Sequence, residues 1–117
     1  MLNDIARKED VARLVDEFYD AVMNDDILAP FFSHIDFTHH KPRMIHFWAF
    51  VLLDEPGYAT NIFDKHSTMN LNREALKRWT ELFEKTARLL FEGEKTEQAI
   101  LRAKTIAWTF QEKMKLE

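Results

Sequence analysis

The sequence predicts an all-α fold, and three observations support this prediction. The 117 residues include only 2 Gly and 3 Pro, so the turn signals that separate the strands of β-sandwiches and barrels are scarce. Apolar residues recur at spacings of three and four along much of the chain, as they do on one face of an amphipathic helix. The length suits one domain, and no linker divides the sequence. We therefore expect residues 1–117 to form a single helical domain.

The first helix is predicted from Asp10 to about Asn24. Its apolar face comprises Val11, Leu14, Val15, Phe18, Tyr19 and Val22. The segment ILAPFF that follows is short and contains Pro30, which predicts a tight helical turn. This turn would direct Phe31 and Phe32 toward the interior, where two large rings need a broad surface to cover them.

The second helix is predicted to begin close to residues 39–41 and to run to about Asp54. Thr38 is a suitable N-cap residue, and Pro42 is tolerated in or near the first turn of a helix. The later part, FWAFVLL, is apolar on nearly all sides, which predicts a helix buried on most of its surface.

A loop of more than a dozen residues, 55–70, is predicted next. It opens with a Pro-Gly stop signal and has no helical or strand period. Loops of this length in small domains are usually functional or disordered. This one contains Tyr58, Ile62 and Phe63, residue types that disordered segments tend to lack, so we expect it to be ordered and functional.

The third helix is predicted to start at a cap formed by Asn70 or Asn72 and to end at Gly93, and Thr96 is expected to cap the fourth. The short connection EGEKT predicts that these two helices pack as an antiparallel pair. The first and second helices would form another pair. Core positions are expected at Phe18, Leu76, Leu82, Phe83, Ala103, Ile106, Trp108 and Phe110.

Composition excludes several classes of function. The 16 basic and 20 acidic residues are interspersed and give a net charge of −4, which argues against nucleic acid as a partner. The absence of cysteine excludes a disulfide scaffold and a thiolate nucleophile. The longest apolar run, Ile45 to Leu53, is far shorter than the ~20 residues that span a bilayer. We expect a soluble cytoplasmic protein with no membrane partner.

His66 is the strongest ligand candidate among the five histidines. Neither an H-E-x-x-H motif nor a repeated Glu-x-x-His motif is present, so zinc-protease and di-iron sites lack their required ligands. The adjacent His39 and His40 point about 100° apart on a helix and do not jointly hold a metal. His34 and His46 are expected to be exposed or hydrogen-bonded polar residues. His66 lies in the long loop of an aromatic-rich chain, which suits either a single axial ligand of a planar iron porphyrin or an ordinary polar loop position.

Five segments in a defined order carry a family resemblance. They are VARLVDEFYDAVMNDDILAPFF, HKPRMIHFWAFVLL, DKHSTMNL, RWTELF and RAKTIAWTFQ, and together they cover nearly the whole chain. With them the chain resembles the group III truncated haemoglobins, short bacterial globins in which two helices pack over two around a haem. The implied fold is the all-α truncated globin, a two-over-two helical sandwich. The implied cofactor is haem b, iron protoporphyrin IX.

The resemblance assigns roles to four residues around the iron. His66 corresponds to the proximal histidine that ligates the metal. Tyr19 corresponds to the distal tyrosine that hydrogen-bonds a gas ligand, and Trp79 to the distal-side tryptophan of the group. His40 corresponds to a histidine near the distal entrance. Pro42 departs from the pattern, and from it we expect a distal helix that starts late and leaves His40 free to swing between pocket and solvent.

The resemblance also assigns residues that hold the porphyrin. Phe32 matches a phenylalanine that wedges against the ring. Lys65 and Arg78 correspond to positions that steer the haem propionates. The helix that lines the distal pocket contributes Met44, Phe47 and Trp48.

The family implies reversible binding of diatomic gases, namely O2, NO or CO. Two hydrogen-bond donors near the ligand slow its release, which suits ligand sensing, NO detoxification or peroxide-type redox chemistry better than bulk O2 transport. Multiple turnover would need an external reductase, because we find no flavin or nicotinamide domain. Two alternatives stay open: a haem-free helical interaction or regulatory module, and a globin whose iron is held by His66 together with His40 or Tyr19.

Overall fold

The computed structural model describes residues 1–56 and 71–113, and these residues form five helices and no strand. In chain order the helices are α1 (Lys8–Met23), α2 (Ala29–Phe32), α3 (Phe37–Leu53), α5 (Arg73–Leu90) and α6 (Glu94–Lys113). The predicted all-α fold is therefore confirmed.

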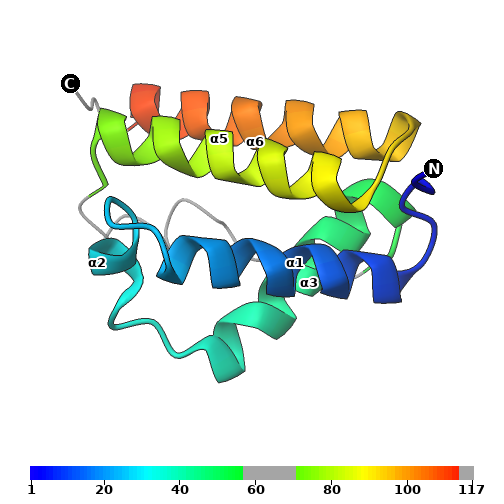
Figure 1. The fold of residues 1–117 in the computed structure, drawn as a ribbon, viewed down its shortest axis with the longest axis horizontal. Helices are drawn as coiled ribbons and strands as arrows, with labels where there is room; N and C mark the ends of the chain where they lie inside the picture. The colour runs from blue at the N-terminus through cyan, green and yellow to red at the C-terminus, as the bar shows by residue number, and fades with distance from the viewer. Residues whose placement is uncertain (57–70, 114–117) are drawn as a thin grey trace.

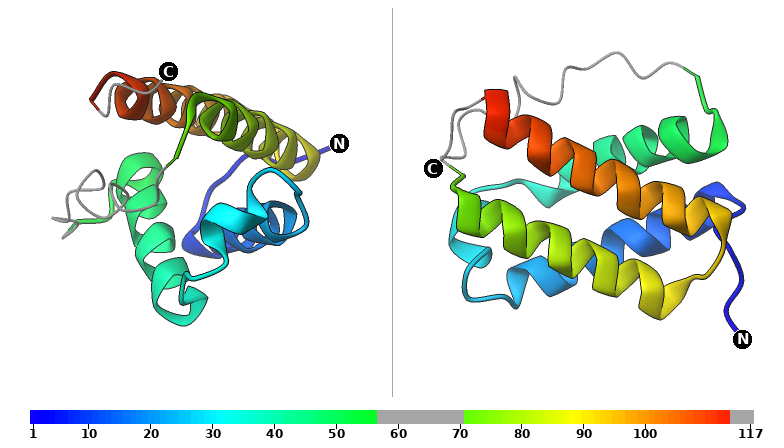
Figure 2. Two further views of the ribbon diagram at one scale, coloured as in Figure 1. Left: turned by 90° about the vertical axis from the view of Figure 1, so that its left-hand side faces the viewer. Right: turned by 90° about the horizontal axis from the view of Figure 1, so that it is seen from above.

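The helices form two layers (Figure 1). α5 and α6 run antiparallel, side by side, as one layer, while α1 and α3 form the second layer beneath them. Across the layers α1 packs on α5 and α3 packs on α6, and Figure 2 shows α3 crossing below the pair. Val11, Leu14, Leu28 and Leu52 are completely buried between the layers. The arrangement is the predicted two-over-two sandwich.

The first helix begins two residues earlier than predicted, at Lys8. The carboxylate of Asp10 accepts hydrogen bonds from the backbone N–H groups of Ala6 and Arg7, at 2.9 and 3.0 Å. Asp10 therefore lies inside the first turn, where a carboxylate also complements the helix dipole. The tight turn predicted around Pro30 is confirmed as α2.

The prediction for the start of α3 was wrong. The helix begins at Phe37, and its N-cap is Asp36, whose carboxylate accepts a hydrogen bond from the N–H of Thr38 at 3.0 Å. Pro42 is the sixth helical residue, so the helix tolerates one lost backbone hydrogen bond in its second turn. The C-terminal end is as predicted: Leu53 is the last helical residue, and Asp54 follows in the left-handed conformation with φ 58°.

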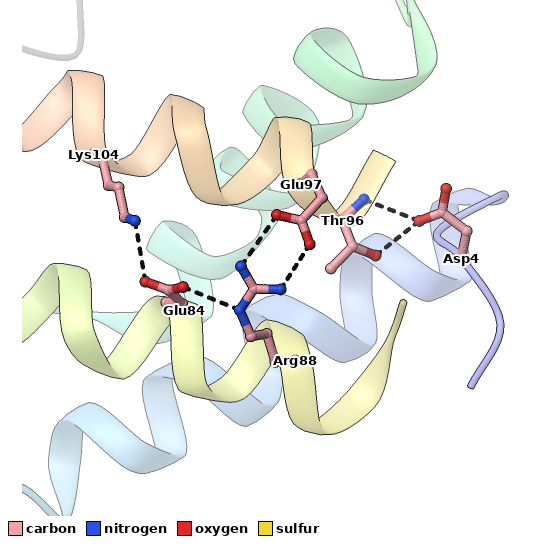
Figure 3. Close-up of polar contacts among 6 residues, drawn as sticks. All are labelled: Asp4, Glu84, Arg88, Thr96, Glu97 and Lys104. Atoms are coloured by element: carbon pink, nitrogen blue, oxygen red, sulfur yellow. Dashed lines mark hydrogen bonds and ion pairs between the residues drawn. The ribbon is translucent and has the colours of Figure 1, made fainter. Parts of the chain in front are cut away.

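The turn between α5 and α6 is closed by Asp4, a residue about ninety positions away. α5 starts at the predicted cap, Asn72, but α6 starts at Glu94, before the predicted cap Thr96. The Asp4 carboxylate accepts hydrogen bonds from the Thr96 N–H at 2.9 Å and the Thr96 hydroxyl at 2.7 Å, which Figure 3 shows. It also accepts a hydrogen bond from the Lys95 N–H at 2.8 Å. Asp4 thus supplies the N-terminal cap of α6 from outside the helix.

Gly93 makes this approach possible. Its φ is +145°, a conformation that side chains disfavour. A Cβ at this position would also lie 2.5 Å from the Asp4 Cγ. Glycine is therefore required both by the backbone conformation and by the close approach of the capping carboxylate.

Trp108 is not a core residue, which corrects the prediction. Its exposed fraction is 62%, whereas its neighbours Ala107 and Phe110 on α6 are buried. Ile106, Ala107 and Phe110 share the buried face of α6, and Trp108, rotated by about 100° from Ala107, lies beyond the edge of that face. The apolar character of Trp108 suggested burial, but the packed face of α6 is the one that carries the small residues Ala103 and Ala107.

The first prediction concerns the Asp4 cap. Asp4→Ala should lower the free energy of unfolding by about 1 kcal/mol at neutral pH, the usual cost of a lost N-cap. Burial raises the pKa of Asp4, but the hydrogen bonds from Lys95 and Thr96 outweigh it and hold the pKa below the ordinary 3.8. The cap therefore contributes fully above 3.8 and is lost as the pH falls through the lowered value.

Urea unfolding followed by circular dichroism across the acid range measures this effect. The difference between the wild type and Asp4→Ala should shrink at low pH. Asp26→Ala, which removes an exposed aspartate, is the control and should leave stability nearly unchanged. A constant difference at all pH values would contradict the assignment of the cap to the ionised carboxylate.

Candidate functional site

An apolar pocket lies between the two layers of helices. Its lining comes from all five described helices and from Leu71, two residues before α5 begins. The lining residues are Phe18, Tyr19, Phe32, Met44, Phe47, Trp48, Leu71, Leu76, Trp79, Ile106 and Phe110. Six of the predicted site residues, those at positions 19, 32, 44, 47, 48 and 79, meet here. The enclosed volume is about 30 Å³, so the rings on opposite walls lie close together.

Aromatic rings from three helices form one wall of this pocket. The Phe83 ring of α5 stacks on Trp48 of α3, with 4.8 Å between the ring centroids. It also stacks on Trp79, which lies on α5 as well, at 6.0 Å. Phe18 of α1 meets the edges of Trp79 and Phe83, at 5.7 and 5.3 Å. These contacts hold Trp48 and Trp79 in fixed orientations toward the pocket.

The polar end of the pocket is a hydrogen bond between Tyr19 and His40. The Tyr19 hydroxyl lies 2.8 Å from the His40 Nε2 atom, and the two ring centroids are 5.1 Å apart. Phe32 and Phe37 contact the same phenol ring, at 6.0 and 5.3 Å. His40 is held within a regular helix, which corrects the expectation that Pro42 makes the helix start late.

Tyr19 remains protonated at neutral pH. It is 5% exposed, and burial raises the pKa of its hydroxyl far above the ordinary value of 10.0. A neutral phenol has one O–H donor and oxygen lone pairs. Tyr19 can therefore either donate to His40 or accept from it, according to which nitrogen of the imidazole carries the proton.

Arg78 lies outside the pocket lining and forms an ion pair at the corner between α1 and α2. Its Nε donates to the Asp25 carboxylate at 2.6 Å, and that carboxylate also accepts from the N–H groups of Ile27 and Leu28. Burial raises the pKa of Asp25, but these hydrogen bonds outweigh it and hold the pKa below its usual range. If Arg78 bound a haem propionate, as the family resemblance predicts, the propionate would compete with the Asp25 carboxylate for the guanidinium.

His66 and Lys65 lie outside the described residues, so their predicted roles stay predictions. Two of the other histidines make contacts near them in the chain. His39 Nδ1 is 2.6 Å from the Asp36 carboxylate, and His46 Nε2 is 3.1 Å from the Pro56 carbonyl oxygen.

Sequence reasoning missed part of the pocket lining. Ile106 and Phe110 were assigned only to the core, and Leu71 was not singled out. An antiparallel pairing of α5 and α6 places the start of one helix beside the end of the other. This antiparallel pairing places Ile106 and Phe110, near the end of α6, beside Leu76 and Trp79, near the start of α5, and could have predicted them as pocket residues.

The comparisons with known proteins agree with this geometry. The chain is 30% identical over 111 residues to the group 3 truncated haemoglobin of Campylobacter jejuni, covering 89% of this chain and 87% of that protein. The chain belongs to the group 3 truncated haemoglobins. No family model matches the sequence.

A solved structure supports the same family. The crystal structure of a group III truncated haemoglobin from Campylobacter jejuni superposes on this truncated haemoglobin with a TM-score of 0.86 and 28% sequence identity. The match covers 96% of this chain and 94% of the other. Across the described parts of the chain, none of the helices has the length and apolar character needed to cross a membrane.

The second prediction concerns Tyr19 in this truncated haemoglobin. Above pH 10.0 the unfolded chain ionises its tyrosines, while folded Tyr19 does not, so folding stability should fall as the pH rises beyond that value. The chain has 2 tyrosines, so in the Tyr58→Phe variant Tyr19 is the only tyrosine whose ionisation is observed. The ultraviolet absorbance of tyrosinate in this variant should rise only when the protein unfolds.

Tyr19→Phe is the matched control, because it retains the ring and should reduce the alkaline loss of stability. Ionisation of Tyr19 near its ordinary pKa in the folded Tyr58→Phe protein would contradict the burial of the hydroxyl.

Proposed function

We propose that the protein binds haem b between its two helix layers and reversibly binds a diatomic gas, O2, NO or CO. One observation supports this most directly in a truncated haemoglobin: an aromatic pocket whose polar end is the Tyr19 hydroxyl, 2.8 Å from His40 Nε2. An ordinary hydrophobic core needs no such pair.

The residues of the pocket suit this group in their chemistry. The lining is aromatic and aliphatic apart from the Tyr19 hydroxyl and the indole nitrogens of Trp48 and Trp79, as the faces of a porphyrin require. The enclosed space of about 30 Å³ is much smaller than a porphyrin, so the layers must separate to admit it. Phe32, Met44 and Phe47 lie on elements of the lower layer, whose movement would widen the pocket.

His66 is the proposed iron ligand, by its match to the family motif DKHSTMNL. Phe32 and the α3 residues Met44, Phe47 and Trp48 would form walls against the porphyrin. Lys65 and Arg78 are the candidates for its propionates. When bound, the haem supplies the metal centre at which diatomic gases bind.

The chain's own groups control the ligand side of the pocket. Tyr19 is a neutral buried phenol with a single O–H, and it can donate that hydrogen toward a ligand when His40 Nε2 carries a proton and donates to the Tyr19 oxygen. Trp79 offers an indole N–H, a donor without acceptor capacity. Two donors beside an apolar wall would stabilise a bound polar ligand and slow its departure.

Slow release suits ligand sensing, NO detoxification or peroxide-type redox chemistry in the cytoplasm better than bulk O2 transport. Any repeated redox turnover would draw electrons from an external reductase.

A haem-free interaction or regulatory module is the second candidate. The small enclosed volume and the continuous packing of Trp48, Phe83 and Trp79 favour it, because these residues already form a filled core. The two candidates differ in their response to haem, which the next experiment measures.

The third prediction is that purified protein takes up haem stoichiometrically and gives sharp visible spectra in the ferric state and in the ferrous state with carbon monoxide. His66→Ala should lose or alter these spectra, because the proximal ligand is missing. His34→Ala, which changes an exposed histidine, is the control and should retain them. Haem should also raise the melting temperature of the wild type. Absence of specific uptake would favour the haem-free module.

The fourth prediction is that Tyr19→Phe releases oxygen about tenfold faster, because one hydrogen bond of about 1.4 kcal/mol is lost while the ring remains. Stopped-flow measurement of the dissociation rate tests it. Trp79→Phe should accelerate release through the loss of its N–H, and Tyr58→Phe is the control. An unchanged rate in Tyr19→Phe would remove Tyr19 from the ligand site without affecting the haem assignment.

A further inference from the structure

A groove lies between α5 and α6, the two antiparallel helices that run side by side in Figure 1. Its volume is about 400 Å³. The lining comprises Arg73, Leu76, Lys77, Thr80, Glu81 and Glu84 of α5 with Lys104, Ala107, Trp108 and Gln111 of α6. The groove thus has a partly apolar floor and charged rims.

Trp108 stands on the rim of this groove with 62% of its surface exposed. Leu101, seven residues earlier on α6, is 66% exposed and lies on the same side of the helix. Tryptophan is the residue type most enriched among the residues that dominate binding at protein interfaces. An exposed tryptophan beside an apolar groove therefore indicates a contact surface.

Most charges around the groove already have partners within the chain. Glu84 pairs with Lys104 and Arg88, and Arg88 pairs with Glu97, as Figure 3 shows. Arg73 lies within hydrogen-bond distance of the Gln111 amide oxygen. By contrast, Lys77 and Glu81 are exposed and form no ion pair with any residue in the described ranges.

We propose that two copies of this chain associate through this groove about a two-fold axis. Lys77 and Glu81 are four residues apart on α5, a separation of about 6 Å along the helix. A two-fold axis that passes between them sets Lys77 of one copy opposite the partner's Glu81, and the reverse pair forms by symmetry. Trp108 of each copy then packs against the groove of the other.

The charge pattern favours a second copy over another partner. One unpaired cation and one unpaired anion at this spacing are self-complementary, whereas a uniformly acidic or basic surface would match only one of them. The exposed face of two helices of 18 and 20 residues spans roughly 500 Å² per copy, from their length and diameter. Since stable interfaces bury about 800 Å² per partner, the dimer should be weak and concentration-dependent.

Sedimentation velocity on the full-length, haem-loaded protein over a concentration series tests the proposal. Wild type should shift from monomer to dimer as concentration rises. Lys77→Glu sets an acidic residue opposite the partner's Glu81, and Glu81→Lys sets a basic residue opposite the partner's Lys77, so each variant should dimerise at least tenfold more weakly. The double variant Lys77→Glu/Glu81→Lys exchanges the charges and should recover the wild-type dimer.

An equimolar mixture of the two single variants provides the sharpest comparison, because an all-acidic rim then faces an all-basic one. The mixture should form heterodimers more tightly than either variant alone forms homodimers. Lys85→Glu, the same charge change on α5 outside the groove, should leave the dimer unchanged. Trp108→Ser should weaken it, with helical circular dichroism unchanged.

A wild type that stays monomeric at all concentrations would overturn the proposal. So would a double variant that fails to recover the dimer, because the charges would then meet some other surface. Haem spectra recorded on the same samples test haem binding independently of dimerisation, because none of these variants alters a residue that lines the pocket.

Discussion

The contacts of the Phe83 ring are the constraint on which the rest of the fold depends. Phe83 is 2% exposed and joins α1, α3 and α5 through Phe18, Trp48 and Trp79. Because Phe18 is fixed against this wall, the next residue, Tyr19, is rotated by about 100° around α1, toward the start of α3. The hydroxyl of Tyr19 thereby reaches His40. A packing contact in the core thus positions the polar pair that gives the pocket its chemical character.

Two aspartates tie the N-terminal part of the chain to the α5 and α6 layer. Asp4 caps the start of α6, and Asp25 holds the corner after α1 while it pairs with Arg78 of α5. Both carboxylates accept backbone N–H bonds that would otherwise lack partners, so each joins a local turn to a distant helix. These ties lie at opposite ends of α5 and limit how far the layers can move apart. Any ligand that enters between the layers therefore works against them.

The sequence predicted the features that depend on local pattern. Helical period gave the four long helices, and Asn72 was found as a cap because its partner is three residues away. Features that depend on distant partners were missed. Thr96 was expected to cap α6, but the cap is Asp4, and no local pattern shows that pairing. The family resemblance assigned both Tyr19 and His40 to the distal side but predicted no contact between them. Periodicity could not predict it either, because it says which face a residue occupies but not which helix lies opposite. Trp108 was misplaced because its hydrophobicity was weighed without the small residues beside it.

The core and the proposed ligand site share the same side chains in this protein. Trp48 and Trp79 hold the helices together through Phe83, and they also line the pocket, so truncating either removes packing and pocket wall together. A loss of ligand binding in such a variant says little about a direct role in binding, because large-to-small core changes alone cost several kcal/mol. The Tyr19 hydroxyl is different. Its ring packs against Phe18, Phe32, Phe37 and the His40 imidazole, while the oxygen makes the hydrogen bond to His40, so removal of the oxygen leaves the ring packing in place. Stability depends on the ring and the proposed ligand chemistry on the oxygen, and at this position the two can be separated.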